Sequence, residues 1–450
     1  METTAASHKL SYMKIHGVFP IVDLKSERAQ LLLKKIRSRN AILDAGVRGT
    51  VVEIIRNVRA SGDAAVKKYT QEFDGVTLER FRIPPEEITR AKSAVGSRLM
   101  SILEEAAANV RMFHENQKER SWTIHKEDGT ILGQRVLPLE RVAVYVPGGT
   151  AAYPSTVIMN AVPAQVAGVD EIIVITPPNK DGSVNLNVLA TCAILGLENV
   201  YSVGGAQAIA AVAYGTESIP KVDKIVGPGN VYVTAAKKEV FGDVDIDMIA
   251  GPSEVVVLAD SSANPAEVAA DLLAQAEHDV NAAAILVTTD GRLARKVKRN
   301  IEVLLKGLVR GRIASESIRR NGAAFVARTV SDAVALVNQI APEHLELIAR
   351  DSWEILDKIR NAGAVFLGEY SPEPVGDYFA GPSHVLPTGG TARFSSVLGV
   401  DAFVKRSSII HYSRTAFEND SKKIQTFAEN EGLTAHAMSI KIREKSGRKK

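Results

Sequence analysis

The residues best placed in this sequence to bind a metal ion or a polar substrate are Gln275 and His278, at the end of a predicted helix. The helix is predicted to begin at Pro265, a residue type favoured at the first helical position. Val268, Leu272 and Gln275 share one face, so an amide stands where the pattern expects an apolar side chain. His278 follows Gln275 by three residues, so both side chains can face one object. A buried amide and imidazole need partners, and either a bound ligand or local hydrogen bonds would supply them.

A second group of polar residues lies in a segment rich in glycine and proline, residues 375–384. This composition predicts a loop, and loops on rigid scaffolds often carry functional sites. Asp377, together with Gln275, His278 and a further histidine, offers the nitrogen and oxygen ligands that Zn²⁺ accepts. The alternative is that Asp377 caps a turn and that His384 is an ordinary loop histidine.

Glu343 and His344 place a carboxylate and an imidazole side by side at the start of a predicted strand. Adjacent residues on an extended chain point to opposite faces, although beside a loop the two can still flank one substrate. Such a pair can divide acid and base duties, with an imidazole whose unperturbed pKa is about 6.5. The alternative is that one of the two faces solvent and takes no part in chemistry.

Short apolar runs that alternate with helical segments would position these side chains. The first series comprises runs at 142–146, 172–175, 200–203 and 224–226. A second series follows Gly251, with runs at 255–258, 284–287, 324–326, 345–348 and 364–367. This alternation predicts an α/β fold made of two Rossmann-like modules, each with a parallel sheet covered on both faces. In such sheets ligands bind at the carboxyl ends of the strands, so we expect ligands at the turns that follow them.

Glycine-rich turns follow the runs of the first series, at residues 147–149, 204–207 and 227–230. Each turn precedes a helical segment, and such turns let the backbone approach a phosphate at a helix N-terminus. They also serve as tight structural turns. The dinucleotide fingerprint G-x-G-x-x-G follows none of the predicted strands, so the turns alone do not distinguish the two roles.

Outside the two series the sequence predicts helices, a hairpin and a small C-terminal domain. The predicted helices cover 26–39, 51–73 with a break at Gly62, a long segment from Pro84 to about Glu119, and 415–430. A predicted hairpin pairs 122–125 with 131–136, and the runs at 402–404 and 409–412 indicate a hairpin or an extended pair. We expect a helical N-terminal segment at 1–40, a first Rossmann-like domain from 41–138 and 251–396, a second at 139–250, and a C-terminal domain at 397–450.

Composition excludes several classes of function. The chain has 450 residues, 45% of them hydrophobic and 24% charged, which is typical of a soluble globular protein of two or three domains. A net charge of +3 is too small to indicate a nucleic-acid or membrane partner, and we interpret the basic C-terminal cluster as a solvated tail. The single cysteine, Cys192, excludes an internal disulfide and a thiolate metal site. Without a signal pattern or a long apolar stretch, the expected compartment is the cytoplasm.

Several motifs that occur in a fixed order along the chain identify a protein family far more specifically than any single motif does. They lie at 145–149, 204–208, 227–230, 250–254, 273–278, 341–344, 376–378, 384–387 and 432–436. Together they resemble the histidinol dehydrogenase family over nearly the whole chain, except for about the first 40 residues and the basic tail. The resemblance implies a zinc- and NAD-dependent alcohol and aldehyde dehydrogenase. It would oxidise L-histidinol through L-histidinal to L-histidine with two NAD⁺, as the last step of histidine biosynthesis.

The resemblance also assigns roles to individual residues, and the chain carries the expected residue type at each position. The implied zinc ligands, one ion per subunit, are Gln275, His278, Asp377 and His436. His436 would come from the other subunit of a homodimer with shared active sites, through a swapped C-terminal domain. Glu343 and His344 match the catalytic pair. The zinc ligands and His344 also contact the substrate, and further substrate-binding residues are Ser253, His384 and Glu431. The implied dinucleotide contacts, in the domain at 139–250, are Tyr145, Gln207 and Asn230.

The chemistry of alcohol and aldehyde oxidation suits these residues. His344 can accept the hydroxyl proton as the hydride leaves. Aldehyde oxidation often uses a cysteine, but Cys192 lies in a predicted core helix, so we expect a water activated by Glu343. Zinc would bind the imidazole and amino group of histidinol and thus act as a template.

Three other functions remain open at this point. A paralogue in the same family could oxidise another polyol, such as a sulfonated propanediol, and histidinol turnover would decide. A zinc hydrolase without a dinucleotide would fit the missing fingerprint, and NADH formation would exclude it. A non-catalytic ligand-binding α/β protein would show neither activity, and a metal assay with a chelator would test it.

Overall fold

The computed structural model describes residues 19–38, 45–148 and 153–447. The chain divides into two compact units, of which unit 1 comprises Met1–Gln117 and Leu139–Phe403, and unit 2 comprises Lys118–Pro138 and Val404–Lys450. Parts of the predicted N-terminal segment, Gly149 of the first glycine-rich turn and residues 448–450 of the basic tail lie outside the described residues.

Unit 1 contains a six-stranded sheet, sheet A, in the order β1-β11-β10-β9-β12-β13 with all pairs parallel. Its strands are β1 (Ile21–Asp23), β9 (Glu254–Ala259), β10 (Ala283–Thr288), β11 (Ala323–Val326), β12 (His344–Ile348) and β13 (Ala364–Leu367). The central strands β9, β10 and β12 are buried along their whole length. Continuous apolar runs form such strands because both faces of the sheet are covered.

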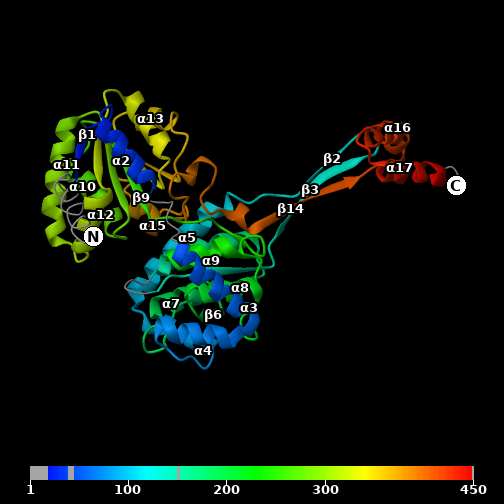
Figure 1. Cartoon of the computed structure of the whole chain (residues 1–450), viewed down its shortest axis with the longest axis horizontal. Coiled ribbons are helices and arrows are strands. Elements are labelled where there is room, and N and C mark those ends of the chain that lie inside the picture. Colours follow the sequence, from blue (N-terminus) through cyan, green and yellow to red (C-terminus); the bar gives the residue numbers. More distant parts are fainter. Residues whose placement is uncertain (1–18, 39–44, 149–152, 448–450) are drawn as a thin grey trace, which may run out of the picture. The chain divides into compact units, whose positions relative to one another are not determined.

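Helices cover both faces of sheet A (Figure 1). One face packs α10 (Pro265–Ala276), α11 (Gly291–Leu304) and α12 (Gly311–Asn321) against side chains such as Val255. The other packs α2 (Glu27–Ser38), α13 (Val330–Ile340) and α14 (Ser352–Leu356) against side chains such as Val256. Neighbouring residues of β9 thus face opposite cores, as the pleat of a strand requires. Shorter elements of this part are η2 (Leu305–Gly307), α15 (Glu373–Tyr378) and η3 (Thr391–Arg393).

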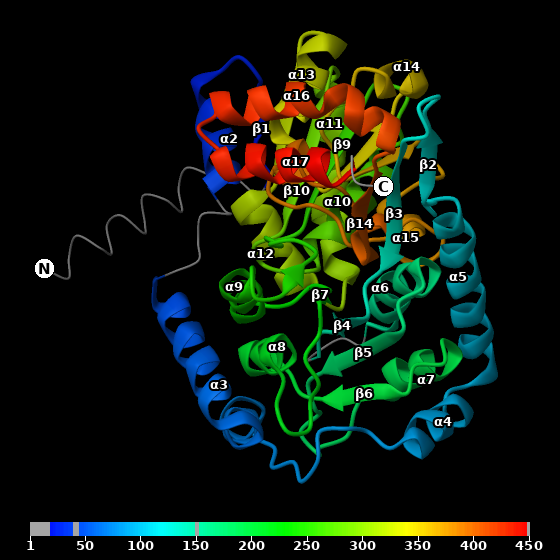
Figure 2. The ribbon, with the colours of Figure 1, turned by 90° about the vertical axis from the view of Figure 1, so that its right-hand side faces the viewer.

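The second sheet of unit 1, sheet B, has five parallel strands in the order β6-β5-β4-β7-β8. Its strands are β4 (Arg141–Tyr145), β5 (Glu171–Thr176), β6 (Asn199–Ser202), β7 (Lys224–Val226) and β8 (Asp245–Ile246). Figure 2 shows helices on both sides of it. They are α3 (Ala45–Asp74), α8 (Gly205–Tyr214) and α9 (Val231–Val240) on one face, and α4 (Pro85–Ala94), α6 (Pro154–Ala167) and α7 (Leu186–Ile194) on the other. The predicted α/β class with two parallel sheets is confirmed.

The packing of the early helices differs from the predicted grouping. Residues 41–138 were expected to join 251–396, whereas α3 packs on α8 and α9, and α4 packs on α7, all on sheet B. In the N-terminal segment, β1 pairs with β11 at the edge of sheet A, and α2 packs on one face of that sheet. Helical periodicity identifies an apolar face, but it does not say which of two similar sheets will cover it.

Two details of these helices bear on the sequence patterns. Gly62 interrupts α3 with φ 49° and ψ −130°, where the predicted break falls. The single helix predicted from Pro84 to Glu119 is wrong, because Val95 has the extended angles φ −86° and ψ 136° and separates α4 from α5 (Ser97–Glu115). The β-branched Val95 followed by Gly96 explains the break, since both residue types lower helix propensity.

Unit 2 is a three-stranded antiparallel sheet in the order β14-β3-β2, followed by two helices. Its elements are β2 (Trp122–His125), β3 (Ile131–Pro138), β14 (Val404–His411), α16 (Arg414–Asn430) and α17 (Thr434–Gly447). The hairpin predicted from Asp128-Gly129 is confirmed. Of the hairpin or extended pair expected at 402–404 and 409–412, the hairpin is wrong, because η4 (Val400–Phe403) precedes one continuous extended strand, β14, that pairs with β3 along its full length. Within the described part of the chain, no helix is long and apolar enough to cross a membrane.

Candidate metal and active site

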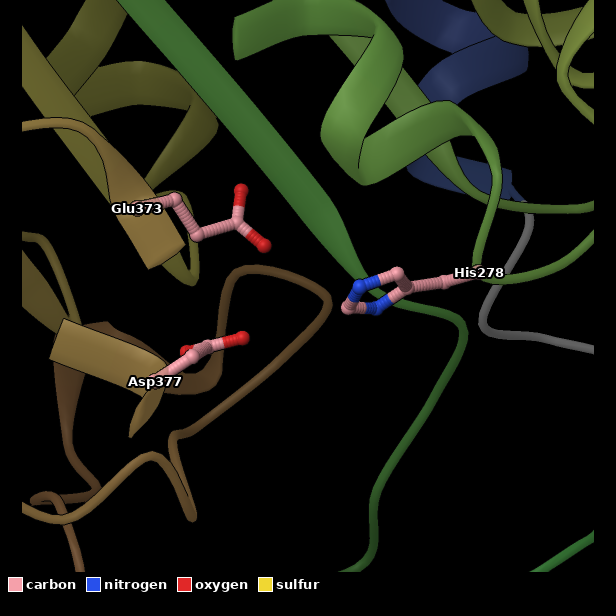
Figure 3. Close-up of side chains that lie close together, drawn as sticks. All are labelled: His278, Glu373 and Asp377. Carbon is pink, nitrogen blue, oxygen red and sulfur yellow. The ribbon is translucent and has the colours of Figure 1, made fainter. Parts of the chain in front are cut away.

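Three side chains of unit 1 converge at the end of α10. The nearest ligand atoms of His278, Glu373 and Asp377 all lie within 4.8 Å of one another (Figure 3). Glu373 and Asp377 stand four residues apart on α15, so both face His278 from one helical face. One imidazole and two carboxylates are a donor set that zinc and related cations accept.

Gln275 completes this group from the last turn of α10, where its side chain is 0% exposed. In one orientation of its amide, Nε2 donates to Glu373 Oε2 at 3.3 Å and to the backbone oxygen of Glu254 at 3.2 Å. That orientation directs the amide oxygen to His278, whose Nδ1 lies 3.3 Å from that end of the amide. The helical spacing therefore brings Gln275 and His278 together as predicted, with an oxygen facing the cluster.

Glu343 and His344 adjoin the same cluster and both are buried. Glu343 directly precedes β12, so its side chain need not point to the face opposite His344, as neighbouring residues within a strand do. Glu343 Oε2 lies 3.7 Å from His344 Nδ1. The backbone N–H of Glu254 donates to Glu343 Oε2 at 2.9 Å. His344 Nε2 lies 3.6 Å from Asp377 Oδ1. The alternative that one member of the pair faces solvent is thus wrong, and His344 stands between two carboxylates.

Burial and charge together shift the pKa values of these groups. Burial raises the pKa of Glu343 to about 7 and that of Glu373 to about 8. Burial lowers the pKa of His344, but the carboxylates of Glu373 and Glu343 outweigh it and raise that pKa well above 6.5. Burial would raise the pKa of Asp377, yet the contact with His344 lowers it. So many carboxyl groups in a buried site favour a positive charge among them, which is the electrostatic condition for binding a cation.

Two imidazole nitrogens of the site lack hydrogen-bond partners among the described residues. These are Nε2 of His344 and Nε2 of His384. Burial lowers the pKa of His384, so a neutral imidazole with a free nitrogen is available there. The neighbouring Ser383 donates its hydroxyl to the Met159 oxygen at 3.3 Å, which anchors this loop on a helix of sheet B. Buried polar atoms without partners are typical of sites that await a ligand.

The remaining predicted substrate and metal residues fall in different places. Ser253 directly precedes β9, and its backbone oxygen accepts from the N–H of Ala283 at 3.0 Å. Glu431, at the end of α16, and His436, in α17, are both exposed and belong to unit 2. The described parts of unit 1 therefore bring together all the predicted metal ligands except His436.

The predicted dinucleotide residues all lie at the carboxyl edge of sheet B. Tyr145 ends β4, and its hydroxyl accepts from the Gly205 N–H at 3.1 Å. Gln207 is 1% exposed, and neither of its amide atoms has a partner among the described residues. Asn230 caps α9 by accepting from the N–H groups of Tyr232 and Val233. Tyr145 and Asn230 thus shape the turns themselves, while Gln207 keeps unsatisfied polar atoms.

Sequence reasoning missed Glu373. It is 1% exposed, and its N–H donates to Glu346 Oε1 at 2.8 Å. The spacing of Glu373 and Asp377 could have revealed it, because residues four apart on a helix share a face. The loop predicted at 375–384 begins two residues after Glu373, whereas α15 begins at Glu373 and continues to Tyr378, with a proline in its first turn, where proline is favourable.

Two doubly covered parallel sheets, with a partly buried cluster of imidazole, carboxylate and amide groups at the edge of one of them, define an α/β protein with a candidate cation-binding site. The family model for histidinol dehydrogenase matches residues 37–444. The chain belongs to the histidinol dehydrogenase family.

Individual relatives agree with the family match. The histidinol dehydrogenase of Geobacillus kaustophilus is 56% identical over 400 residues, which cover 89% of this chain and 94% of that protein. The histidinol dehydrogenase of Bacillus subtilis is 54% identical over 406 residues, which cover 90% of this chain and 95% of that protein. The solved structure of the Elizabethkingia anophelis histidinol dehydrogenase is 38% identical with a TM-score of 0.90, and covers 96% of this chain and 99% of that one. The chain thus matches these relatives over nearly their whole length.

Proposed function

We propose that this protein oxidises L-histidinol through L-histidinal to L-histidine, with NAD⁺ as the hydride acceptor and zinc in the site. The reaction is the last step of histidine biosynthesis. Family membership supports the reaction, and one structural observation carries the site: the ligand atoms of His278, Glu373 and Asp377 lie within 4.8 Å of one another beside Glu343 and His344. The two rival enzyme classes, a dehydrogenase of another polyol and a zinc hydrolase, are outcomes of the test below.

The residues present fit a zinc ion. Gln275, His278 and Asp377 offer an amide oxygen, an imidazole nitrogen and a carboxylate oxygen. We propose His436 as the fourth ligand, supplied by the C-terminal unit of the second subunit in a homodimer. When bound, zinc supplies a template for the imidazole and amino group of the substrate. Ser253, His384 and Glu431 are proposed to hold the rest of the substrate.

In the alcohol step, His344 accepts the hydroxyl proton while the hydride passes from the carbinol carbon to NAD⁺. His344 Nδ1 lies 3.3 Å from the backbone oxygen of Glu254, and Nε2 lies 3.6 Å from Asp377 Oδ1. Nε2 has no hydrogen-bond partner among the described residues, and the charge of a zinc ion bound beside the same carboxylates would oppose the raised pKa of His344 and favour the neutral imidazole. Nε2 is therefore the proton acceptor in this proposal. The products of the step are the aldehyde, NADH and a proton on His344.

In the aldehyde step, Glu343 accepts a proton from the water that adds to the carbonyl carbon. Its pKa of about 7, raised by burial, suits a general base near neutral pH. The carbonyl oxygen takes the proton that the alcohol step left on His344, which completes the hydrate and returns His344 to its neutral form. The hydrate then gives its hydride to a second NAD⁺, and His344 accepts the proton of one of its hydroxyl groups. Cys192 takes no part, because it is 0% exposed in α7 and burial raises its pKa to about 12. A thiol in that state supplies no nucleophile.

The dinucleotide is proposed to bind at the carboxyl edge of sheet B. The chain reverses its order across this sheet between β4 and β7, and ligands of open α/β sheets bind at such a switch point. Tyr145 ends one of these strands, and the turn with Asn230 follows the other. The unsatisfied amide of Gln207 lies on α8 nearby along the same edge.

The decisive experiment incubates the zinc-loaded protein with L-histidinol and NAD⁺ and follows absorbance of NADH. We expect two NADH for each L-histidine formed, loss of this activity after treatment with a chelator, and recovery with Zn²⁺. Oxidation of another polyol without turnover of histidinol would overturn the substrate assignment. Hydrolytic activity without NADH would overturn the proposed reaction.

A further inference from the structure

A buried ion pair lies beneath the turn at residues 227–230. Lys237 of α9 pairs with Asp247, which directly follows β8, and their side chains are 3% and 1% exposed. Neither residue was singled out by the sequence patterns. Charged groups of this kind are almost never fully buried unless they are paired, so their partners indicate what the pair does.

Both members of the pair also hold Gly227. The N–H of Gly227 donates to Asp247 Oδ2 at 2.8 Å, and Lys237 Nζ donates to the backbone oxygen of Gly227 at 3.0 Å. Asp247 Oδ1 accepts both from Lys237 Nζ and from the N–H of Met248, the latter at 2.6 Å. Because each charged group makes several bonds, the pair fixes the backbone on both sides of Gly227.

This fixed point lies where the proposed dinucleotide site begins. Gly227 has φ +105°, and a Cβ added there would lie 2.3 Å from the backbone oxygen of Tyr145. The turn therefore runs tightly against the end of β4, across the switch point of sheet B. Three residues on, Asn230 caps α9 through the N–H groups of Tyr232 and Val233. The pair thus sets the course of the turn from the end of β7 to the start of α9.

Stability is a weak reason for burying such a pair. Removing two charges from water is costly, and apolar residues of similar volume are often neutral or stabilising in place of a buried ion pair. Apolar side chains would fill the same space, but they could not bond to the N–H and oxygen of Gly227. What only the charged pair supplies here is a fixed backbone conformation.

We propose that Lys237 and Asp247 are positioning residues that hold the turn 227–230 in the conformation that binds the dinucleotide. This inference rests on the proposed function, because it takes NAD⁺ as the ligand of sheet B. The two residues act through the backbone of Gly227 and do not touch the reacting atoms. Their loss should therefore weaken NAD⁺ binding and leave substrate and metal binding unchanged.

The test compares three forms of the zinc-loaded, full-length protein by calorimetric titration with NAD⁺ and, separately, with L-histidinol. The double variant Lys237→Met with Asp247→Leu removes the pair without leaving a single buried charge. We expect its Kd for NAD⁺ to rise by about tenfold or more, with an unchanged Kd for histidinol and unchanged zinc content. The control double variant Arg48→Met with Glu239→Gln removes another ion pair of α9, in which Arg48 is exposed, and should keep the Kd for NAD⁺ within about twofold.

The outcomes separate this inference from the proposed function. An unmodified protein that binds no NAD⁺ would overturn the proposed function. A folded double variant that binds NAD⁺ as tightly as the unmodified protein would overturn only the positioning role. Should the first variant not fold, Lys237→Met with Asp247→Asn retains an acceptor for the Gly227 N–H, while the Gly227 oxygen and the Met248 N–H lose their partners. A smaller rise in the Kd for NAD⁺ then supports the inference, and an unchanged Kd contradicts it.

Discussion

The two parallel sheets of unit 1 share one strand order but carry their candidate functional residues at opposite edges. Sheet B reads β6-β5-β4-β7-β8, and sheet A contains the corresponding order β11-β10-β9-β12-β13 with β1 added. In sheet B, Tyr145 and the turn at 227–230 lie at the carboxyl ends of strands, as expected. In sheet A, Glu254 and His344 are the first residues of β9 and β12, so the cluster lies at the amino edge.

The candidate residues of sheet B therefore lie at the carboxyl edge, where ligands were expected, whereas the cluster of sheet A lies at the opposite edge. The physical reason is the kind of group that each edge offers. At the amino edge, the backbone N–H of Glu254 donates to the Glu343 carboxylate at 2.9 Å. At the carboxyl edge, Gly227 presents backbone held by a buried ion pair. The first edge suits charged side chains, and the second suits close approach of a ligand to the main chain.

The strongest test of this contrast removes the central imidazole of sheet A. Replacing His344 by Asn should lower kcat for NADH formation by about 10²- to 10⁴-fold, because no other group accepts the hydroxyl proton. NAD⁺ affinity, measured by titration, should not change, because the dinucleotide is assigned to sheet B. The exposed His125 on β2 offers a control, and His125→Asn should leave both quantities unchanged. A large loss of NAD⁺ affinity in His344→Asn would show that the two edges are not separate sites.

A second replacement divides the two oxidation steps within the sheet A site. Glu343→Gln removes the base that activates water but keeps the shape of the side chain. Oxidation of histidinal should fall by about 10²-fold or more, whereas oxidation of histidinol to the aldehyde should be largely retained. Single-turnover NADH formation with histidinol and with histidinal measures both steps. Equal losses in the two reactions would contradict the division of roles between Glu343 and His344.

The third test concerns the residue that the sequence patterns missed. Glu373→Ala removes the carboxylate that accepts from Gln275 Nε2 at 3.3 Å, so the amide oxygen is no longer directed to the cluster. Outer partners of metal ligands typically change metal affinity by about 10- to 100-fold, and we expect a loss in this range by competition with a zinc-binding dye. The exposed Glu369 provides a matched control. If Glu373→Ala and Glu369→Ala bind zinc equally well, Glu373 does not orient the amide.

The smallest effect is expected from the only cysteine, in the core that backs sheet B. Cys192→Ala should leave the rates of both oxidation steps within about twofold, because no thiol takes part in the proposed chemistry. The lost packing of a fully buried side chain should lower the free energy of unfolding by about 1 kcal/mol, which thermal or chemical unfolding would measure. A selective loss of histidinal oxidation in this variant would instead support a covalent thiohemiacetal.

Local patterns predicted much of the fold. The apolar runs at 142–146 and 255–258 became β4 and β9, and the break at Gly62 and the turn at Asp128-Gly129 fall where expected. Such features depend on residues close in sequence, whose conformational preferences act over one or two turns of chain. The broken helix at Val95 shows the limit of this approach, because a pattern of apolar spacing can continue across a short interruption.

The candidate site divides in the same way. Gln275 and His278 lie three residues apart on one helix, so their spacing alone predicts that they face one object, and the structure agrees. Glu343 and His344 are adjacent, but only the fold shows both of them buried against Asp377. Glu373 lies just before the predicted loop at 375–384, and only the fold shows that α15 places it beside Asp377. The roles of Glu431 and His436 stay predictions that rest on the family resemblance.

By itself, the sequence determined the α/β class, the helix face with Gln275 and His278, and the family. The tertiary structure decided which sheet the early helices cover, which edge of sheet A gathers the carboxylates, and how Lys237 and Asp247 hold Gly227. The physical reason is the distance along the chain over which each kind of interaction acts. Propensity and periodicity act between near neighbours along the chain, whereas burial, ion pairing and pKa shifts depend on groups that only folding brings together.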